Sequence, residues 1–464
     1  MHYTLKNRSK IIGTLVPISA LTSNTHNNGT FSAGLIFLDW LKNTNQSAWQ
    51  ILPLNETQLE AGSTTKHIPS PYKSYGIGLD PKYLPESFAG IYPSRSEKNA
   101  FLLAQREWLP DYAFFCALRD YFQTDDWRKW DKDLRNRDKT TLDHWSGQLA
   151  KEIDTHVITQ WQLHQSYMQL KNKAKTLGII LIGDVSFYLS MQSPLLWVHQ
   201  DAFQIEKDGT MQYVSGVPDG NSALFGRQVW GHPLYNWEKN DHYQKISTFW
   251  KMRLRHMSQL FDVIRFDYAK GFFQYGAMDI HNEKNDRYKQ GPGEKILKEL
   301  VAFNHNHGVM SFAEDCGRNL EQLRKSMEKI NIPGVKIFCF GITGKDEKIN
   351  KEYTEIAHYP INTIAYTTMH DTETLLGYLH ILTSEQKQLL AEAAHVTYNK
   401  EDKKFAKTLR NAILDSPSQT VIIPIQDWLL TTDRINTPGT ELPVNDPNWD
   451  FHLKIPIENL PIHV

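Results

Sequence analysis

Short apolar runs recur along the chain, and most are separated by segments in which apolar residues repeat every three to four positions. Alternation of this kind is typical of βα units that build a parallel sheet. The eight predicted strands are residues 13–18, 49–54, 179–185, 262–267, 309–315, 334–340, 363–371 and 420–427. Eight such units close a barrel, so the pattern predicts an α/β protein of the (β/α)8 TIM-barrel class.

Two of the intervening helices have recognisable ends. Asn319, with Gln322 three residues later, is expected to open one helix as its N-cap. The inward stripe of that helix is Leu320, Leu323, Met327 and Ile330. The preceding helix is expected to end at Gly308, where a left-handed backbone carries no steric penalty.

The strand spacing is uneven, because long segments separate the second, third and fourth predicted strands. Residues 55–178 are expected to form a mostly helical insertion subdomain, and residues 186–261 a second insertion. Both follow strands at their carboxyl ends, the face that holds the active site of such barrels, so they are expected to wall a groove. Only about 37 residues follow position 427, fewer than a β-sandwich of roughly 100 residues needs. We therefore expect one elaborated barrel, residues 1–464, without a C-terminal β-sandwich domain.

Charge and composition narrow the classes of partner. Hydrophobic residues make up 40% and charged residues 22%, as in ordinary globular proteins. The 51 Lys and Arg nearly cancel the 52 Asp and Glu, so no overall field favours nucleic acid or an acidic membrane. No window has the roughly 18 apolar residues of a membrane span. A neutral ligand fits this balance best.

The cysteines and the start of the chain bear on location. Cys116, Cys316 and Cys339 are far apart and form no CxxC pair, which is typical of reduced cytoplasmic thiols and not of a zinc site. Basic residues before the apolar run 11–21 imitate a secretion signal, but Thr14 and Pro17 interrupt that run. We interpret it as the first barrel strand and expect a cytoplasmic protein.

Acidic residues collect at the carboxyl ends of the predicted strands. They are Asp184, Asp267, Glu314, Asp315, Asp371 and Asp427. Unpaired carboxylates are costly at the edge of a packed core, so their repeated placement there indicates a chemical task. Any one of them alone is explained equally well as the cap of the following helix.

Two chemistries use several acids on one barrel face: a magnesium site, or glycoside cleavage by a nucleophile and an acid. Arg265 leaves its strand on the same side as Asp267 and is expected to hold that carboxylate ionised. Glu314 follows Phe312 and Ala313, apolar surroundings that favour its protonated form. In retaining glycosidases such a pair lies about 5 to 5.5 Å apart. This pattern favours glycoside cleavage.

Other residues are candidates for gripping a sugar. His370 and Asp371 on the seventh strand are expected to hold its hydroxyls. Aromatic residues reach 12%, and sugar rings stack on aromatic faces. Tyr72 and Trp230 lie beside Pro and Gly in loops and are predicted to be subsite walls. Core packing is the favoured interpretation of Trp49, Trp197 and Trp237.

Ordered motifs along nearly the whole chain resemble the 4-α-glucanotransferases called amylomaltases or disproportionating enzymes. They are WQILPL (49–54), SPYKSYG (70–76), LIGDVSFY (181–188), GVP (216–218), GRQVWGHPLYNW (226–237), VIRFDYAKGF (263–272), AEDCG (313–317), PGVKIF (333–338), MHDTETLLG (369–377), RINTPGT (434–440) and NW (448–449). The resemblance implies an α-amylase-like barrel that lacks the C-terminal sandwich and needs no metal or other cofactor. Its implied partners are α-1,4-glucan donors and acceptors such as maltooligosaccharides and glucose.

The resemblance also implies roles for individual residues. Asp267 corresponds to the nucleophile, Glu314 to the general acid and base, and Asp371 to the transition-state stabiliser. The implied donor-sugar residues are Arg265, His370, Asp184, Ser70 and Tyr72. Trp230 is implied on the acceptor side, and the loop from Gly216 onward is implied to arch over the glucan.

The chain departs from the family pattern near the nucleophile. The family usually has His directly after the nucleophile and Arg two residues further on, where this chain has Tyr268 and Lys270. Gln192 replaces an expected acid, and Thr372 and Glu373 alter the usual polar pair. A tyrosine can still donate one hydrogen bond to a sugar, but it does not become cationic.

The leading hypothesis from the sequence is therefore transfer of α-1,4-glucan segments by a retaining double displacement. Three alternatives remain open: an α-glucan hydrolase, a glucan-binding protein with weakened catalysis, and a magnesium-dependent barrel lyase. The second is motivated by Tyr268 and Lys270, and the third only by the acids on strands three to five.

Overall fold

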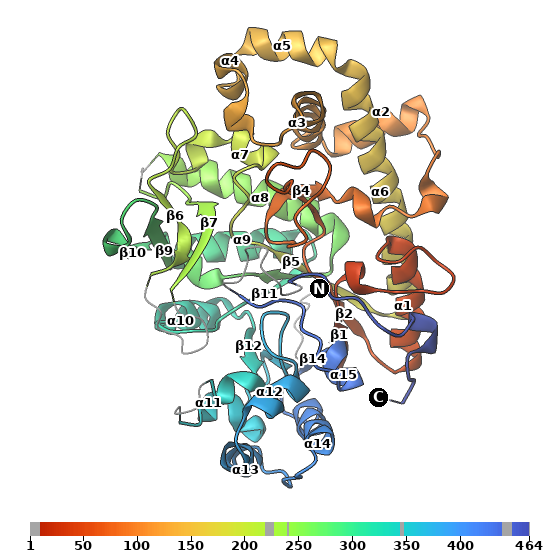
Figure 1. Ribbon diagram of the computed structural model, residues 1–464, viewed down its shortest axis with the longest axis vertical. Coiled ribbons are helices and arrows are strands. Elements are labelled where there is room, and N and C mark those ends of the chain that lie inside the picture. Colours follow the sequence, from red (N-terminus) through yellow and green to blue (C-terminus); the bar gives the residue numbers. More distant parts are fainter. Residues whose placement is uncertain (1–9, 219–226, 239–240, 344–347, 439–447, 464) are drawn as a thin grey trace.

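Eight parallel strands form the centre of the molecule (Figure 1). The computed structural model describes residues 10–218, 227–238, 241–343, 348–438 and 448–463. In sheet order the strands are β11 (Met310–Ala313), β8 (Val263–Phe266), β5 (Ile180–Val185), β2 (Ala48–Gln50), β1 (Ile11–Leu15), β14 (Thr420–Pro424), β13 (Thr363–Tyr366) and β12 (Gly334–Ile337). Every neighbouring pair is parallel. Between the two outer strands, Ala313 N donates to Pro333 O at 3.1 Å. The predicted (β/α)8 barrel is confirmed.

The amino-acid sequences of the barrel strands explain why these strands are buried. β14 reads TVIIP with all five residues buried, and β8 reads VIRF with all four buried. β-Branched residues suit strands of a parallel sheet that is covered on both faces. Gly13 meets a steric demand, because a Cβ there would lie 2.4 Å from the carbonyl oxygen of Ala48 on the adjacent strand. The run 11–21 that imitates a secretion signal thus begins with β1, as predicted.

The strands end earlier than the apolar runs predict. Asp184 lies inside β5, but Asp267 and Glu314 follow β8 and β11 by one residue, and Asp371 follows β13 by five. After β8 the chain turns through Tyr268, whose φ is +46°. The carboxyl ends of the strands therefore open into loops, and most of the acids lie on these loops.

Helices surround the barrel in Figure 1. They are α1 (Phe31–Asn43), α6 (Ala150–Leu177), α8 (His242–Leu260), α9 (Glu294–Asn306), α10 (Glu321–Ile330), α11 (Lys351–Thr354), α12 (Leu375–Ile381), α13 (Ser384–Ala393), α14 (Asp402–Leu414) and α15 (Ile425–Leu429). The connecting 3₁₀ turns are η2 (Ile18–Ala20), η7 (Ala269–Phe272), η9 (Phe338–Gly341), η10 (Ile356–His358) and η11 (Ile457–Asn459).

The two predicted helix ends have different outcomes. Helix α9 is followed by Gly308 with φ +76°, as expected. The N-cap predicted at Asn319 is wrong, because α10 has Leu320 in the cap position without a side-chain hydrogen bond. Asn319 adopts φ +56° instead, so its backbone turns the chain into the helix.

Most of residues 55–178 lie above the barrel in Figure 1, while α6 runs from there down its side to α1. The segment contains one hairpin and several helices. Its elements are β3 (Asn55–Thr57), β4 (Ser74–Leu79), η3 (Pro81–Tyr83), η4 (Glu86–Phe88), α2 (Arg95–Ala104), α3 (Leu109–Phe122), η5 (Trp127–Lys129), α4 (Lys132–Arg135), α5 (Lys139–Gln148) and the long barrel helix α6. The loop between β3 and β4 carries Ser70 and Tyr72.

A second sheet has the strand order β10-β9-β6-β7. Its strands are β6 (Tyr213–Val217), β7 (Gln228–Pro233), β9 (Gln274–Asp279) and β10 (Arg287–Gln290). The nearby short elements are α7 (Pro194–Val198), η6 (Gln200–Ala202) and η8 (Glu283–Asn285). Only β6 and β7 lie within residues 186–261, so the segment after β8 completes this sheet.

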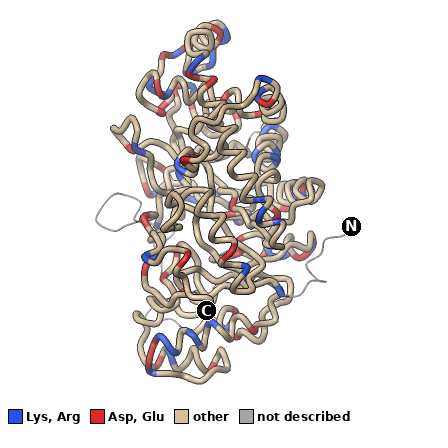
Figure 2. The backbone as a smooth tube through the Cα atoms, turned by 90° about the vertical axis from the view of Figure 1, so that its right-hand side faces the viewer, with Lys and Arg blue, Asp and Glu red and all other residues tan. Residues whose placement is uncertain are grey.

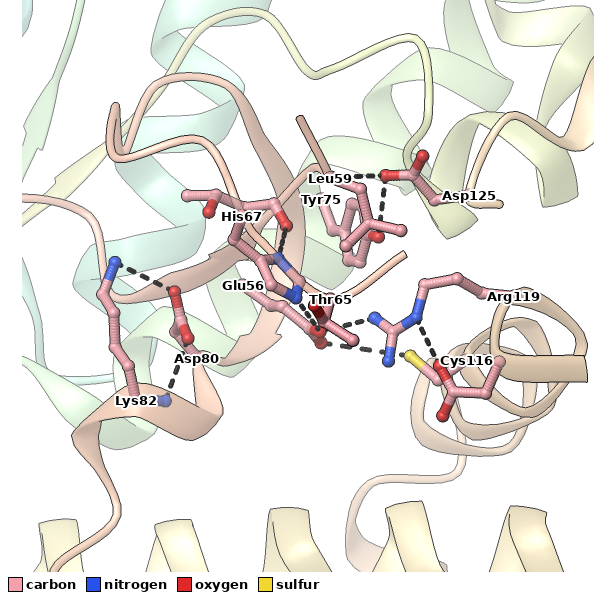
Figure 3. A network of polar contacts seen from close by, with 12 residues as sticks. Glu56, Leu59, Thr65, His67, Tyr75, Asp80, Lys82, Cys116, Arg119 and Asp125 are labelled. Carbon is pink, nitrogen blue, oxygen red and sulfur yellow. Dashed lines mark hydrogen bonds and ion pairs between the residues drawn. The ribbon is translucent and has the colours of Figure 1, made fainter. Parts of the chain in front are cut away.

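Figure 3 shows a buried polar network that fastens the β3–β4 loop to the helical segment. Arg119 Nη1 lies 2.6 Å from Glu56 Oε1, and Tyr112 donates to Glu56 Oε2. His67 Nε2, on the loop, is 3.8 Å from the same Glu56 carboxylate. Asp125 Oδ2 accepts from Leu59 N at 2.7 Å. The network joins the hairpin and its loop to α3 and to Asp125 through buried charges and hydrogen bonds.

Charged residues of both signs are interspersed along the chain trace in Figure 2, as the near-zero net charge predicts. Across the described ranges, no helix combines the length and apolar character needed to cross a membrane.

Candidate active site

A cleft opens at the carboxyl ends of the barrel strands. Its lining residues are Ser70, Tyr72, Ser186, Phe187, Tyr188, Gln228, Trp230, His232, Asp267, Tyr268, Glu314, Asp371, Asn436, Pro438 and Trp449. Six of the nine residues predicted for the site are among them. The other three, Asp184, Arg265 and His370, are each at most 2% exposed and lie against the lining residues through the hydrogen bonds described below. The structure therefore brings the nine predicted residues together in one place.

Arg265 is the centre of the acidic group. On β8 it is the register partner of Asp184 on β5, to which its Nη1 donates. The same Nη1 lies 3.1 Å from Asp267 Oδ1, and Nη2 lies 2.7 Å from Glu314 Oε2. Arg265 and Asp267 leave β8 on the same side, as predicted. Two carboxylates that line the cleft are thus held across one planar guanidinium.

The expected division of charge between the two acids needs correction. Glu314 is not in apolar surroundings, because its Oε2 accepts hydrogen bonds from Arg265 and, at 3.2 Å, from the backbone N–H of Tyr268. Burial raises the pKa of Asp267 well above its usual value, and the neighbouring carboxylates of Asp184 and Glu314 add to this effect against Arg265. Arg265 does not hold Asp267 ionised by itself, because three carboxylates share its charge.

Asp371 has the opposite electrostatic setting. Desolvation opposes its ionisation, but His370 and a hydrogen bond from Asn436 Nδ2 at 2.6 Å outweigh it and lower the pKa to about 2. His370 Nε2 lies 3.2 Å from Asp371 Oδ2 and 3.0 Å from Tyr72 Oη. Since the Tyr72 hydroxyl donates to Asp184 at 2.8 Å, a proton on Nε2 satisfies both neighbours of His370. Asp371 is therefore a permanent negative charge beside the other two acids.

Aromatic rings form two walls of the cleft. On one wall Tyr72 stacks on His370 at 5.5 Å between centroids, and Trp449 lies 5.5 Å from Tyr72. On the other wall Trp230 meets Tyr268 edge to face at 4.9 Å. Tyr72 and Trp230 thus lie where subsite walls were predicted.

The tryptophans interpreted as core have mixed outcomes. Trp49 and Trp197 are fully buried, as predicted. Trp237 is half-buried and packs against the core, with its ring 5.4 Å from that of Tyr235.

The positions that depart from the family pattern have clear local roles. Tyr268 lines the cleft with a left-handed backbone, and burial raises the pKa of its hydroxyl. Lys270 Nζ lies 5.0 Å from the centre of the Tyr288 ring. Glu373 pairs with Arg434 at 2.6 Å. Thr372 Oγ1 accepts from Met369 N at 2.9 Å. The Gln192 side-chain oxygen accepts from Ser190 Oγ at 2.9 Å.

Asn436 and Trp449 are among the cleft residues to which sequence reasoning assigned no role. Both belong to motifs of the family resemblance, RINTPGT and NW, which were the available signal. They lie more than 60 residues from Asp371, and only the fold shows that Asn436 binds it. Most of the loop from Gly216 onward, residues 219–226, lies outside the described residues.

Besides Asp184, two of the strand-end acids do not line the cleft. Asp315 accepts from Val335 N at 2.7 Å and pairs with Arg324 at 2.9 Å, so it fastens β11 to β12. Asp427 lies in α15 and is 1% exposed. In the part of the chain that the structure describes, no group of three or more His, Cys, Asp or Glu side chains is placed to hold a metal ion.

Comparisons with known proteins identify the family of this chain. The family described as 4-alpha-glucanotransferase, glycoside hydrolase family 77, matches residues 16–84 and 82–457. The 4-alpha-glucanotransferase of Aquifex aeolicus is 27% identical over 96% of this chain and 96% of its own, and that of Thermus thermophilus is 28% identical over 92% and 91%.

Solved structures agree as well. An amylomaltase from Streptococcus agalactiae, in complex with acarbose, has a TM-score of 0.82 and 25% identity, covering 96% of this chain and 95% of its own. An amylomaltase from Corynebacterium glutamicum has a TM-score of 0.75 at 16% identity, covering 98% and 73%, and shares the fold. The chain belongs to the 4-alpha-glucanotransferase family, glycoside hydrolase family 77.

Proposed function

We propose that the chain transfers segments of α-1,4-glucans between maltooligosaccharides, with Asp267 as nucleophile, Glu314 as general acid and base, and Asp371 as transition-state stabiliser. One observation carries this assignment. Three carboxylates line a single cleft, where Arg265 touches two of them and His370 and Asn436 hold the third.

In the first step Asp267 attacks C1 of the donor sugar while Glu314 gives its proton to the glycosidic oxygen. The bond between C1 and that oxygen breaks, the leaving glucan departs with a free hydroxyl, and a β-glucosyl ester forms. In the second step an acceptor hydroxyl attacks C1, Glu314 takes its proton, and Asp267 is released. The permanent charge of Asp371 stabilises the positive charge that develops on the ring.

This mechanism requires a particular distribution of protons between Asp267 and Glu314. Burial favours a proton on Asp267 in the free site, whereas the first step needs Asp267 ionised and Glu314 protonated. A bound donor supplies the reason for the change, because its glycosidic oxygen offers a partner to protonated Glu314 and its anomeric carbon attracts an ionised Asp267. Proton placement is therefore coupled to binding of the donor.

The two walls suggest the direction in which the glucan lies. Ser70, Tyr72 and His370 are near Asp371, which supports their assignment to the donor sugar. Trp230, on the opposite wall with Tyr268, is assigned to the acceptor. Arg265 and Asp184 lie below the lining and are assigned to the donor site because they hold its acids and Tyr72.

Incubation with maltotriose tests the proposed reaction. A transferase yields glucose together with a ladder of longer maltooligosaccharides. Glucose and maltose that accumulate without any longer product would instead establish a hydrolase.

A second candidate function is glucan binding with weakened catalysis. It is favoured by Tyr268, which lines the cleft where the family usually has a histidine that can become cationic. This candidate predicts that maltooligosaccharides bind without turnover and that Glu314→Gln leaves that binding unchanged. Turnover that Glu314→Gln abolishes would eliminate it. Full activity in EDTA would exclude the magnesium-dependent lyase.

We also propose that residues 55–178 and 186–261 wall the glucan groove of one elaborated barrel, and that the protein is cytoplasmic. The first proposal is supported by the cleft residues that these segments supply, among them Tyr72 and Trp230. The second is supported by three free cysteines.

A further inference from the structure

The segment after β13, residues 367–374, carries His370 and Asp371 but belongs to neither a strand nor a helix. Its shape therefore depends on side-chain hydrogen bonds. Asn436 N donates to His370 O at 3.1 Å, and Thr372 Oγ1 accepts from Met369 N within the segment. These bonds fix the middle of the segment but neither of its ends.

Asp427 binds both ends. Its Oδ2 accepts from the hydroxyls of Thr367 at 2.5 Å and Thr368 at 2.6 Å, directly after β13. Its Oδ1 accepts from the backbone N–H of Leu375 at 2.7 Å, the first residue of α12. Asp371 lies between these two attachment points. One buried side chain thus joins the two ends of the segment that presents Asp371. Each end is also held separately, by Cys339 N donating to Thr367 O at 3.2 Å and by Thr374 Oγ1 donating to Thr431 O at 2.7 Å.

The three hydrogen bonds to Asp427 require both oxygens of a carboxylate. Asp427 is 1% exposed, and among the described residues no cation forms an ion pair with its side chain, so its burial must be offset by its hydrogen bonds. Hydrogen bonds from hydroxyls to a carboxylate are short and stronger than bonds between neutral groups. An asparagine has the same shape but offers one acceptor oxygen, so it cannot accept from the hydroxyls on one side and from the Leu375 N–H on the other.

Arg410 supports Asp427 from its backbone side. Its Nη1 donates to the carbonyl of Trp428 at 2.9 Å, and its guanidinium lies 4.9 Å from the centre of the Trp428 ring. Helix α15 is thereby fixed, and the direction of the Asp427 side chain with it.

We propose that Asp427 is a positioning residue for transfer: its carboxylate fixes the distance between β13 and α12 and so holds Asp371 against the reacting sugar. This inference rests on the proposed role of Asp371. It concerns a residue that does not line the cleft and touches neither donor nor acceptor.

The test is Asp427→Asn, measured by steady-state kinetics of glucan transfer. A misplacement of about 1 Å at a reacting group costs on the order of 100-fold, so kcat should fall by about 10- to 100-fold while KM changes by less than about threefold. Asp80→Asn is the matched control. Asp80 is also a buried carboxylate, but it caps the turn at Lys82 and lines no part of the cleft. Its kcat should stay within about twofold of wild type.

A double-mutant cycle distinguishes positioning from general loss of stability. If Asp427 acts through Asp371, then Asp427→Asn added to Asp371→Asn should lower kcat by less than about threefold further. A full additional loss in that background would overturn the inference, as would a kcat for Asp427→Asn no lower than that of the Asp80→Asn control. If Asp371→Asn itself keeps wild-type kcat, the proposed role of Asp371 fails and this inference with it.

A second variant covers the case in which Asp427→Asn does not fold. Thr368→Val has the same shape, removes one hydroxyl donor and leaves the carboxylate in place. It should lower kcat by about 3- to 10-fold, whereas Thr363→Val, at the other end of β13, should not. Equal kcat values in these two variants would overturn the inference.

Discussion

At the scale of single residues, the site depends on how one guanidinium is divided among several acids. Arg265 touches Asp184, Asp267 and Glu314, so none of them receives its whole charge. Burial raises the pKa of Asp267 against the shared charge of Arg265, whereas at Asp371 the contacts with His370 and Asn436 outweigh burial and lower the pKa to about 2. The proposed mechanism needs a constant charge on Asp371 and a changing charge on Asp267, and the different pKa values of these two acids meet that need.

Asp267→Asn should lower kcat for transfer by on the order of 1,000-fold or more, because an amide cannot form the glucosyl ester. Circular dichroism should show an unchanged fold. Asp262→Asn, just before the same strand, is the control and should keep most of the activity, since its side chain only accepts from Leu181 N. A mild effect of Asp267→Asn would remove that residue as the nucleophile.

The acid limb of the pH profile should report Asp267. Catalysis needs its ionised form, so kcat/KM should fall as pH drops through its raised pKa, at a higher pH than the ordinary value of about 3.9. Asp371, with a pKa of about 2, stays ionised throughout that range. Asp184→Asn removes one neighbouring negative charge and should move the limb to lower pH. A limb that does not move would mean that another group limits the rate.

At the scale of elements, the donor wall depends on a loop that the barrel reaches through the Tyr72 hydroxyl, which bonds to Asp184 and His370. Tyr72 lies on the β3–β4 loop, and the network of Figure 3 fastens this loop to α3 through Glu56, His67 and Arg119. The register of β3 with β4 shifts between Asn55 and Thr57, so backbone pairing alone does not fix the loop. The helical segment therefore contributes to the site through buried charge.

Arg119→Met tests that contribution. It leaves Glu56 buried without its partner, and breaking a buried pair in this way costs about 3–5 kcal/mol of unfolding free energy. KM for the donor should rise as the loop loses its attachment. Arg128→Met removes a partly exposed pair with Asp126 and should cost at most about 1 kcal/mol. Urea unfolding measures both variants, and equal losses would contradict the role of the network.

At the scale of the whole molecule, the sequence predicted all eight barrel strands because each is an apolar run with a helix-like segment beside it. It could not predict that β5 and β8 pair with Asp184 beside Arg265, since register is set by packing. It also missed the second sheet, which joins β6 and β7 with β9 and β10 across a barrel strand. The hydrogen bond from Asn436 to Asp371 likewise joins residues that are distant in the sequence. Local patterns predict elements, whereas contacts distant in sequence decide which side chains share a charge.

The packing of the helical segment on the barrel should make the whole fold acid-sensitive. His256 on α8 is buried, neither of its ring nitrogens has a hydrogen-bond partner in the described part of the chain, and desolvation lowers its pKa to about 3. Its ring lies 4.9 Å from that of Trp108, at the start of α3. The unfolded chain binds a proton near pH 6.5 and the folded chain does not, so unfolding free energy should fall as pH drops from about 6.5 toward 3.

His256→Phe should flatten this dependence, because one group contributes a slope of up to about 1.4 kcal/mol per pH unit in that range. Urea unfolding at pH 7, 5 and 4 measures the slope, and His358→Gln, at an exposed histidine, should leave it unchanged. His232, whose pKa burial lowers to about 4, should account for part of the slope that remains in His256→Phe. Equal slopes in wild type and His256→Phe would contradict this prediction. They would show that the helical segment opens before the barrel unfolds, so that His256 is already exposed to solvent when urea unfolds the barrel.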